Sequence, residues 1–340
     1  MLSLLPAAAP TSVGTPTVWF LTIAGVLGLL VLDFVVTRRP HTVSMREAVA
    51  WSAFYVAIPV AFGVWVWSAH GGERGLEYYT GYLVEKSLSV DNLFVFLLLL
   101  TAFAVPKEYQ QRVLLIGVAG ALVLRGIFIA LGAQLIATFS WAFLLFGAVL
   151  LLTAVKVLRD ALSHADHGVD ISTLRSVRLL RRFWPVTEDY RGTRLTVREH
   201  GRRALTPMAL VVVAILGTDI VFAIDSVPAV YGITEDPYLV FATNAFALLG
   251  LRALYFVLEG ALASLAHLGH GLAAILAFIG VKLVLHWAHD VWAWVPEVPT
   301  LLSLGVIIAI LATVTTTSIL ARRRDERRRA DEQLVDVVSE

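Results

Sequence analysis

Two short apolar segments each carry a pair of acidic residues, and these four carboxylates have the types and spacing to bind a cation. The segment EKSLSVDNLFVFLLLL begins at Glu85 and contains Asp91, whereas GTDIVFAIDSVPAV contains Asp219 and Asp225 at the same spacing of six. A carboxylate inside hydrocarbon costs about 2.5–3.5 kcal/mol by insertion scales. Each acid therefore needs a proton, a basic partner or a bound cation.

The polar residues around the acids favour a hard cation. Asn92 follows one pair and Ser226 follows the other. Carboxylate, amide, hydroxyl and backbone carbonyl oxygens suit Mg²⁺, Ca²⁺ and Mn²⁺ better than thiophilic metals. Arg125 and Arg252, in the next apolar spans, would neutralise two of the four acids and leave up to two negative charges for a divalent ion. The alternative is that the acids and arginines form ion pairs that only hold the helices in register.

A spacing of six does not place two side chains on the same face of a helix. Six residues turn through about 600°, which leaves the side chains roughly 120° apart and about 9 Å apart along the axis. A spacing of seven does align them, so Glu85 shares a stripe with Asn92. Asp219 shares a stripe with Ser226 in the same way. Gathering all these oxygens needs both helices, or a local unwinding at Pro228, because proline removes a backbone hydrogen bond.

The surrounding sequence has the composition of a polytopic membrane protein. Of its 340 residues, 58% are hydrophobic and only 16% are charged, against about a quarter charged in soluble proteins. The mean hydropathy is +0.78, and apolar stretches of about 20 residues recur, long enough to cross a bilayer. We expect nine spans, at about 17–37, 48–68, 80–104, 110–132, 139–158, 207–232, 238–260, 269–288 and 299–320.

The order acid, acid, arginine, lysine occurs twice, once per three predicted helices. Arg125 is followed one span later by Lys156, and Arg252 by Lys282. Since three is odd, equivalent triplets must lie in opposite orientations in the membrane, the inverted-repeat arrangement of secondary transporters. We therefore predict an all-α polytopic membrane protein of about nine transmembrane helices that contains two inverted three-helix repeats. The predicted parts are a transmembrane domain (1–320), the repeats (about 80–158 and 207–288), a basic loop (about 159–206) and a charged tail (321–340).

The distribution of basic residues predicts the orientation. The segment 160–206 holds nine arginines, and the tail contains RRRDERRR at 322–329. The positive-inside rule then places the N-terminus outside and the C-terminus in the cytoplasm of a plasma-membrane protein. Attraction to anionic lipid accounts for these basic segments, so we expect the lipid bilayer, and no nucleic acid, as their partner.

Other chemistry finds little support in the sequence. The chain has no cysteine, which excludes thiolate metal sites and thiol redox chemistry within it. No nucleophile–base set, phosphate-binding loop or dinucleotide fingerprint is evident, so we expect neither an enzyme nor a tightly bound cofactor. Asn244 is either a site residue or an interhelical hydrogen-bond partner. Asp33 is expected at the interface near the cytoplasmic end of the first span, and the alternative is that it joins the site.

The motifs EKSLSVDNLFVF, GTDIVFAIDSVPAV and TNAFALLGLRALYF resemble those of the TerC family of integral membrane proteins, including its Alx-like members. That family is named for tellurium resistance, and its members look like Mn²⁺ exporters, although some are described as membrane-bound redox modulators. The resemblance implies that Asp91, Asp225, Asn92 and Ser226 lie at a transport site.

The resulting hypothesis is an exporter of a divalent metal, Mn²⁺ above others, that works by alternating access. Asp91 and Asp225 would coordinate the transported ion. The supporting ligands would be Glu85, Asp219, Asn92 and Ser226, with Arg125 and Arg252 balancing charge in the empty site. The alternative is a membrane scaffold for stress-response partners, which would dock cytoplasmic proteins through the basic loop and the tail.

Overall fold

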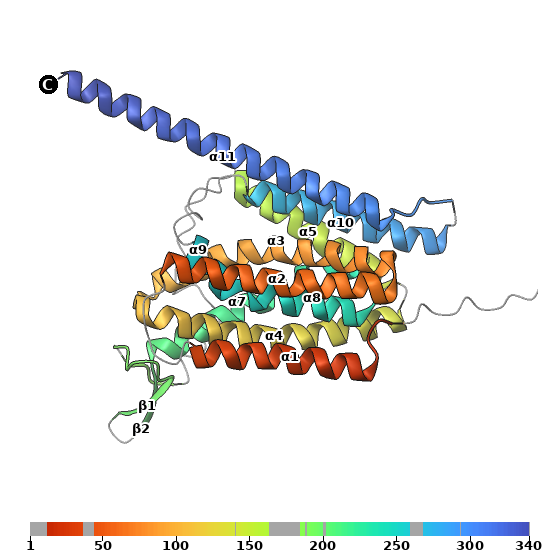
Figure 1. The fold of residues 1–340 in the computed structure, drawn as a ribbon, viewed down its shortest axis with the longest axis horizontal. Helices are drawn as coiled ribbons and strands as arrows, with labels where there is room; N and C mark the ends of the chain where they lie inside the picture. Colours follow the sequence, from red (N-terminus) through yellow and green to blue (C-terminus); the bar gives the residue numbers. More distant parts are fainter. Residues whose placement is uncertain are drawn as a thin grey trace, which may run out of the picture.

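The computed structural model describes residues 12–36, 44–139, 141–162, 184–187, 189–199, 202–258, 268–292 and 294–339 (Figure 1). The described chain is almost entirely helical. Its helices are α1 (Pro16–Val36), α2 (Met45–His70), α3 (Gly72–Ala102), α4 (Lys107–Thr138), α5 (Ala142–Leu162), α7 (Pro207–Tyr231), α8 (Pro237–Leu249), α9 (Leu251–Leu258), α10 (Leu268–Val291) and α11 (Thr300–Ser339). The strands β1 (Thr196–Glu199) and β2 (Arg202–Leu205) form an antiparallel hairpin within the predicted basic loop.

Local signals set several helix ends. The Ser44 side chain accepts a hydrogen bond from the backbone N–H of Glu47 and caps α2. The Asp236 carboxylate caps α8 in the same way, with Pro237 at the first helical position, where its missing N–H costs nothing. Gly71, at φ +90°, lets the chain turn sharply from α2 into α3.

The predicted all-α polytopic fold is confirmed. Eight helical segments among the described residues are long and apolar enough to cross a membrane, with α8 and α9 counted together as Pro237–Val257. The remaining predicted span corresponds to α3, which is not among these eight. At 31 residues, α3 is about 46 Å long, and its middle part carries the charges Glu85, Lys86 and Asp91. It packs among α2, α7 and α8.

Two local predictions differ from the structure. The seventh span is not one helix, because Gly250 interrupts it between α8 and α9. The unwinding considered at Pro228 is not seen, since α7 continues through that residue to Tyr231. The break in the second triplet therefore lies in α8–α9, immediately before Arg252, rather than beside Asp225.

The helices outside the two triplets lie at the periphery. In the apolar 18-residue stretch of each helix, only 17% of the residues of α1, 22% of those of α2 and 11% of those of α11 are buried. The corresponding share for α8 with α9 is 78%. Large apolar side chains on α1 and α2 are exposed, for example Phe20 and Val64. These surfaces face the hydrocarbon of the bilayer.

The two triplets pack on each other in a reciprocal pattern. Helix α3 packs on α8, and α7 packs on α4. Within each of these pairs the two helices run in the same direction: Gly81 lies against Thr243, whereas Lys86 donates to the backbone oxygen of Ala247. In the other pair, Gly117 lies against Ile215, and Gly132 against Tyr231.

Helices α3 and α7 run in opposite directions, because Thr234, just beyond α7, bonds to Glu77 near the start of α3. Helices α5 and α10 are also antiparallel and cross closely at two glycines. A Cβ on Gly147 would lie 2.9 Å from the backbone oxygen of Gly280, and one on Gly280 would lie 3.1 Å from that of Gly147. When α3, α4 and α5 are matched with α7, α8 and α10, the contact of α3 with α8 corresponds to the contact of α7 with α4. The contacts of α3 with α7 and of α5 with α10 each correspond to themselves.

Candidate functional site

Arg125 of α4 forms hydrogen bonds to side chains of α3, α7 and α8. Its side chain is 1% exposed. The guanidinium forms an ion pair with Glu85 of α3 and a second with Asp219 Oδ1 of α7, at 3.3 Å. It also donates to Asn244 Oδ1 of α8 at 2.9 Å. One arginine therefore joins all four helices.

Close helix packing positions this arginine. An added Cβ on Gly117 would lie 2.8 Å from Ile215 Cγ2, and one on Gly120 would overlap the Leu216 side chain. The two glycines let α4 approach α7 where side chains would otherwise separate them. That approach brings Arg125, one turn farther along α4, within reach of Asp219.

Asn92 contributes a fourth acceptor. The hydrogen-bond network orients its amide so that the oxygen accepts from Arg125 Nη2 at 3.1 Å and the nitrogen donates to the Leu88 carbonyl at 3.2 Å. Asn92 lies two turns beyond Glu85 on α3, as the spacing of seven requires. Asn244 makes an interhelical hydrogen bond, since its side-chain oxygen accepts from Arg125.

Several buried oxygens in the described part of the chain keep unused hydrogen-bonding capacity. They are Glu85 Oε2, Asp219 Oδ2, Ser89 Oγ and Ser226 Oγ, none of which has a hydrogen-bond partner. A buried polar atom without a partner costs about 1–3 kcal/mol, and such atoms need an explanation in a native structure. Two carboxylates against one guanidinium also leave a formal charge of −1. The cluster is therefore electrostatically suited to a further positive charge.

Arg252 lies in a different network. It donates to both carboxylate oxygens of Asp33 on α1, at 2.7 and 3.2 Å, and to Gln111 Oε1 of α4 at 3.3 Å. Both Arg252 and Asp33 are nearly fully buried. The described contacts thus pair Arg252 with an acid outside the four that it was expected to balance. Asp33, expected near the cytoplasmic end of the first span, is buried against Arg252 close to the end of α1.

The remaining predicted site residues are Asp225 and Ser226 of α7 and Asp91 of α3. Asp225 is half-buried on α7, near the lipid-exposed Val221 and Ile224. Ser226 is buried on the same helix. The backbone of Asp91 belongs to α3, but its side chain lies outside the described part of the structure. Among the side chains that are described, no group of three His, Asp or Glu lies close enough to hold a metal ion.

The sequence alone contained partial signals for the further residues of these two charge networks. Asp33 is an acid within an otherwise apolar span, the same signal that marked the two acidic pairs. Gln111 precedes a long apolar run, where a single amide attracts little notice. Ser89 lies on the stripe of Glu85 and Asn92, so helical periodicity does place it at the site.

The fold and this buried charge cluster define a polytopic α-helical membrane protein with an intramembrane polar site, since such charges mark functional positions in membrane helices. Residues 70–326 match the sequence model of the integral membrane protein TerC family. The chain belongs to that family.

Relatives across bacteria are similar over most of their length. The chain is 47% identical to an uncharacterized membrane protein of Mycobacterium tuberculosis, over 80% of this chain and 69% of the relative. It is 41% identical to an uncharacterized membrane protein of Myxococcus xanthus, over 88% and 91%. It is 40% identical to a putative membrane-bound redox modulator, Alx, of Escherichia coli, over 88% and 93%. No solved structure matches the chain.

Proposed function

We propose that the protein exports a divalent metal cation, Mn²⁺ above others, across the plasma membrane by alternating access. The observation that carries this proposal is the sharing of Arg125 by Glu85 and Asp219. The two acids come from different triplets, and each keeps one buried oxygen without a partner. A site of this kind at the contact of two triplets has the position that transporters use for coupling ions.

In this proposal, Arg125 acts as a resident cation that the transported ion displaces. The guanidinium has two charged acceptors, Glu85 and Asp219, and two neutral acceptors, Asn92 and Asn244. When a metal ion takes the carboxylates, the amide oxygens still satisfy part of the guanidinium. Competition of this kind keeps buried carboxylates compensated in both states, which matters because an uncompensated buried charge costs several kcal/mol.

The oxygen-only donor set supports the choice of ion. Carboxylate, amide and hydroxyl oxygens suit hard cations, including Mn²⁺. Mg²⁺ loses its bound water reluctantly, so a site made of protein oxygens favours Mn²⁺ over it. Asp91 and Asp225 would complete the coordination or carry the ion toward Glu85 and Asp219. No catalytic step and no tightly bound cofactor enter this proposal.

The reciprocal packing of the triplets supports alternating access. If α3–α5 and α7–α10 are inverted repeats, then rocking one against the other would open the site to opposite sides in turn. By the positive-inside rule, the basic loop and tail support a cytoplasmic C-terminus. In this proposal the N-terminus lies outside, and export runs toward the end where α1 begins.

Flux through sealed vesicles tests this function. The purified chain is reconstituted into proteoliposomes, and efflux of Mn²⁺, Mg²⁺, Ca²⁺ and Zn²⁺ is followed with an ion-sensitive dye. We expect Mn²⁺ flux above that of empty liposomes, and an Asp219→Asn variant at least about tenfold slower, a difference of about 1.4 kcal/mol. Glu73→Gln, an exposed acid at the start of α3, is the matched control and should keep the parental rate. Absence of divalent flux, or an Asp219→Asn variant as fast as its parent, would reject the proposal.

The length of α11 favours a second candidate function, that of a scaffold. Its apolar span is Thr300–Ser318, yet the helix continues unbroken to Ser339. The extra 21 residues extend about 30 Å beyond the span, which would present a charged helix to cytoplasmic partners. Deleting residues 321–340 separates the two functions, because an exporter should keep most of its flux whereas a scaffold should lose its cellular phenotype.

A further inference from the structure

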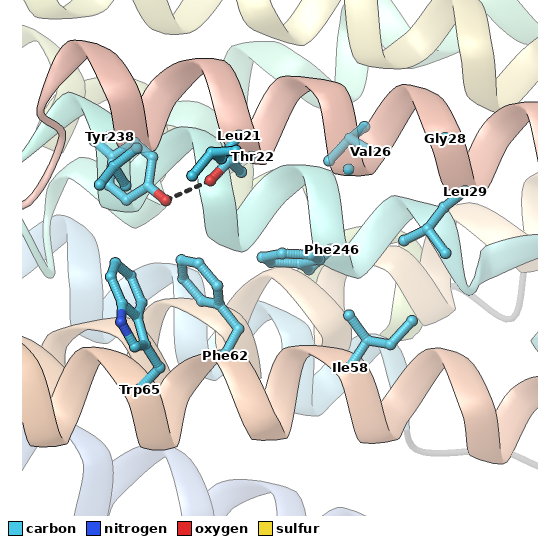
Figure 2. Close-up of a pocket in the computed structure, with 12 residues that line it drawn as sticks. Leu21, Thr22, Val26, Gly28, Leu29, Ile58, Phe62, Trp65, Tyr238 and Phe246 are labelled. Atoms are coloured by element: carbon cyan, nitrogen blue, oxygen red, sulfur yellow. Dashed lines mark hydrogen bonds between the residues drawn. The ribbon is translucent and has the colours of Figure 1, made fainter.

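An apolar groove of about 530 Å³ lies between α1 and α2 (Figure 2). Leu21 and Leu29 of α1 form one wall, and Phe62 and Trp65 of α2 form the other. Phe246 of α8 lies between the walls, and its side chain is 7% exposed. The groove has the size of a ligand site.

The chemistry of the lining excludes a polar ligand. Thr22 and Tyr238 supply the side-chain hydroxyls of the groove, and these bond to each other at 2.6 Å (Figure 2). The indole of Trp65 is the remaining polar side chain of the lining. A polar ligand would lose its hydration without gaining partners, which is costly. The groove therefore fits an apolar chain.

Two glycines on α1 keep the groove open. Gly25 and Gly28 both line it, and a Cβ on either would meet no atom within 4 Å. They lie three residues apart and thus on one face of the helix. Side chains at these positions would enter the groove without disturbing the packing of α1 on α8.

The length and position of the groove identify its occupant. Its α1 wall runs from Val18 to Leu29, about 16 Å along the helix axis, which is half of the roughly 30 Å hydrocarbon core. At the end near Val18, the rings of Trp19 and Tyr238 pack edge to face with their centroids 5.1 Å apart. Trp65 lies at the same end of the groove (Figure 2). Paired aromatic residues of this kind occupy the membrane–water interface. The groove thus extends from the interface to the middle of the membrane.

The groove is also continuous with the lipid-facing surface. Leu21 and Trp65, on its two rims, are 62% and 38% exposed, and both belong to helices whose outer faces contact the bilayer. We propose that the groove binds one acyl chain of a phospholipid from the leaflet in which α1 begins. The bound chain fills the space between α1 and α2 and stabilises the position of α1. That helix supplies Asp33, which forms an ion pair with Arg252.

Native mass spectrometry of the detergent-purified full chain tests this inference. The protein is reconstituted with palmitoyl-oleoyl phosphatidylglycerol and extracted again, and the mass of the protein with its retained lipid is measured. We expect one phospholipid per chain, and at least about a tenfold lower occupancy in the double variant Gly25→Leu, Gly28→Leu, equivalent to about 1.4 kcal/mol. The control is Gly305→Leu on α11, an exposed glycine with no atom within 4 Å of its added Cβ, which should retain lipid like the parent.

A second measurement covers loss of lipid during extraction. In nanodiscs, a spin label on the acyl chain of phosphatidylcholine should show a motionally restricted component that the double variant loses and the control keeps. Equal retention and equal spectra in parent and double variant would overturn the inference. So would a parent that is a dimer and becomes a monomer in the double variant without any change in lipid, since a second copy would then occupy the groove.

Discussion

Glu85 of α3 and Asp219 of α7 meet on a single guanidinium, although 134 positions separate them in the sequence. They are the equivalent acids of the two predicted repeats. Equivalent residues of inverted repeats can meet only near the axis that relates the repeats, so the ion pair marks where that axis would pass. A pair of acids on such an axis can face either side of the membrane with the same ligands, which is what alternating access requires.

Removal of Arg125 should make the stability of the folded protein depend on a bound metal ion. In Arg125→Gln, two buried carboxylates lose their shared counter-charge, which costs about 3–5 kcal/mol. A divalent ion that binds the folded state restores about 2.7 kcal/mol at 100 times its Kd. We therefore expect the variant to melt well below the parent without metal, and Mn²⁺ to raise its Tm more than it raises that of the parent.

The matched control for this prediction is Arg252→Gln. It removes a guanidinium that is buried to a similar degree, but one that pairs with the single carboxylate of Asp33. Its Tm should fall without a specific recovery in Mn²⁺. Equal stabilisation of both variants by Mn²⁺ would show that the metal does not act through Glu85 and Asp219.

Asp225→Asn should abolish Mn²⁺ efflux while the protein still inserts and folds. Asparagine has nearly the same shape as aspartate, so the substitution keeps the packing around this half-buried residue of α7, whereas the transported ion loses a carboxylate ligand. Proteoliposome flux and membrane yield are measured together. The Asp225→Glu variant, which keeps the carboxylate, should retain part of the flux. An Asp225→Asn variant that exports at the parental rate would remove this residue from the site.

Proton coupling should accompany metal export. After the metal leaves, Arg125 compensates only one of the two charges on Glu85 and Asp219, and a proton can neutralise the other. An inward proton gradient, applied with the membrane potential clamped, should then accelerate Mn²⁺ efflux from the vesicles, and a reversed gradient should slow it. Flux that does not respond to either gradient would reject coupling but leave the export function standing.

The sequence was sufficient for the fold because apolar length and basic loops act locally. The nine predicted spans correspond to α1–α5, α7, α8 with α9, α10 and α11, and helical periodicity correctly aligned Asn92 with Glu85. The sequence could not assign partners to the arginines. The repeat pattern suggested one arginine per triplet, but contacts between distant helices decide the pairing. Arg125 takes an acid from each triplet, and Arg252 takes Asp33.

The buried pair Asp33–Arg252 should tie the peripheral helix α1 to the second triplet. Asp33→Asn leaves the buried guanidinium of Arg252 without a charged partner, next to neutral amides such as that of Gln111, and should destabilise the protein by about 3–5 kcal/mol. Arg252→Gln leaves the carboxylate of Asp33 buried and should cost a similar amount. Because neither variant contains an intact pair, the double variant should be more stable than the sum of the two losses predicts.

Thermal unfolding of the parent, both single variants and the double variant completes this cycle. The coupling free energy should be at least about 1 kcal/mol, in the range seen for residues that contact each other. Mn²⁺ flux in the double variant separates a structural role from a transport role. If the pair only anchors α1, flux per folded molecule should stay close to that of the parent. A double variant that is as stable as the parent but carries no flux would instead place Asp33 and Arg252 in the transport machinery.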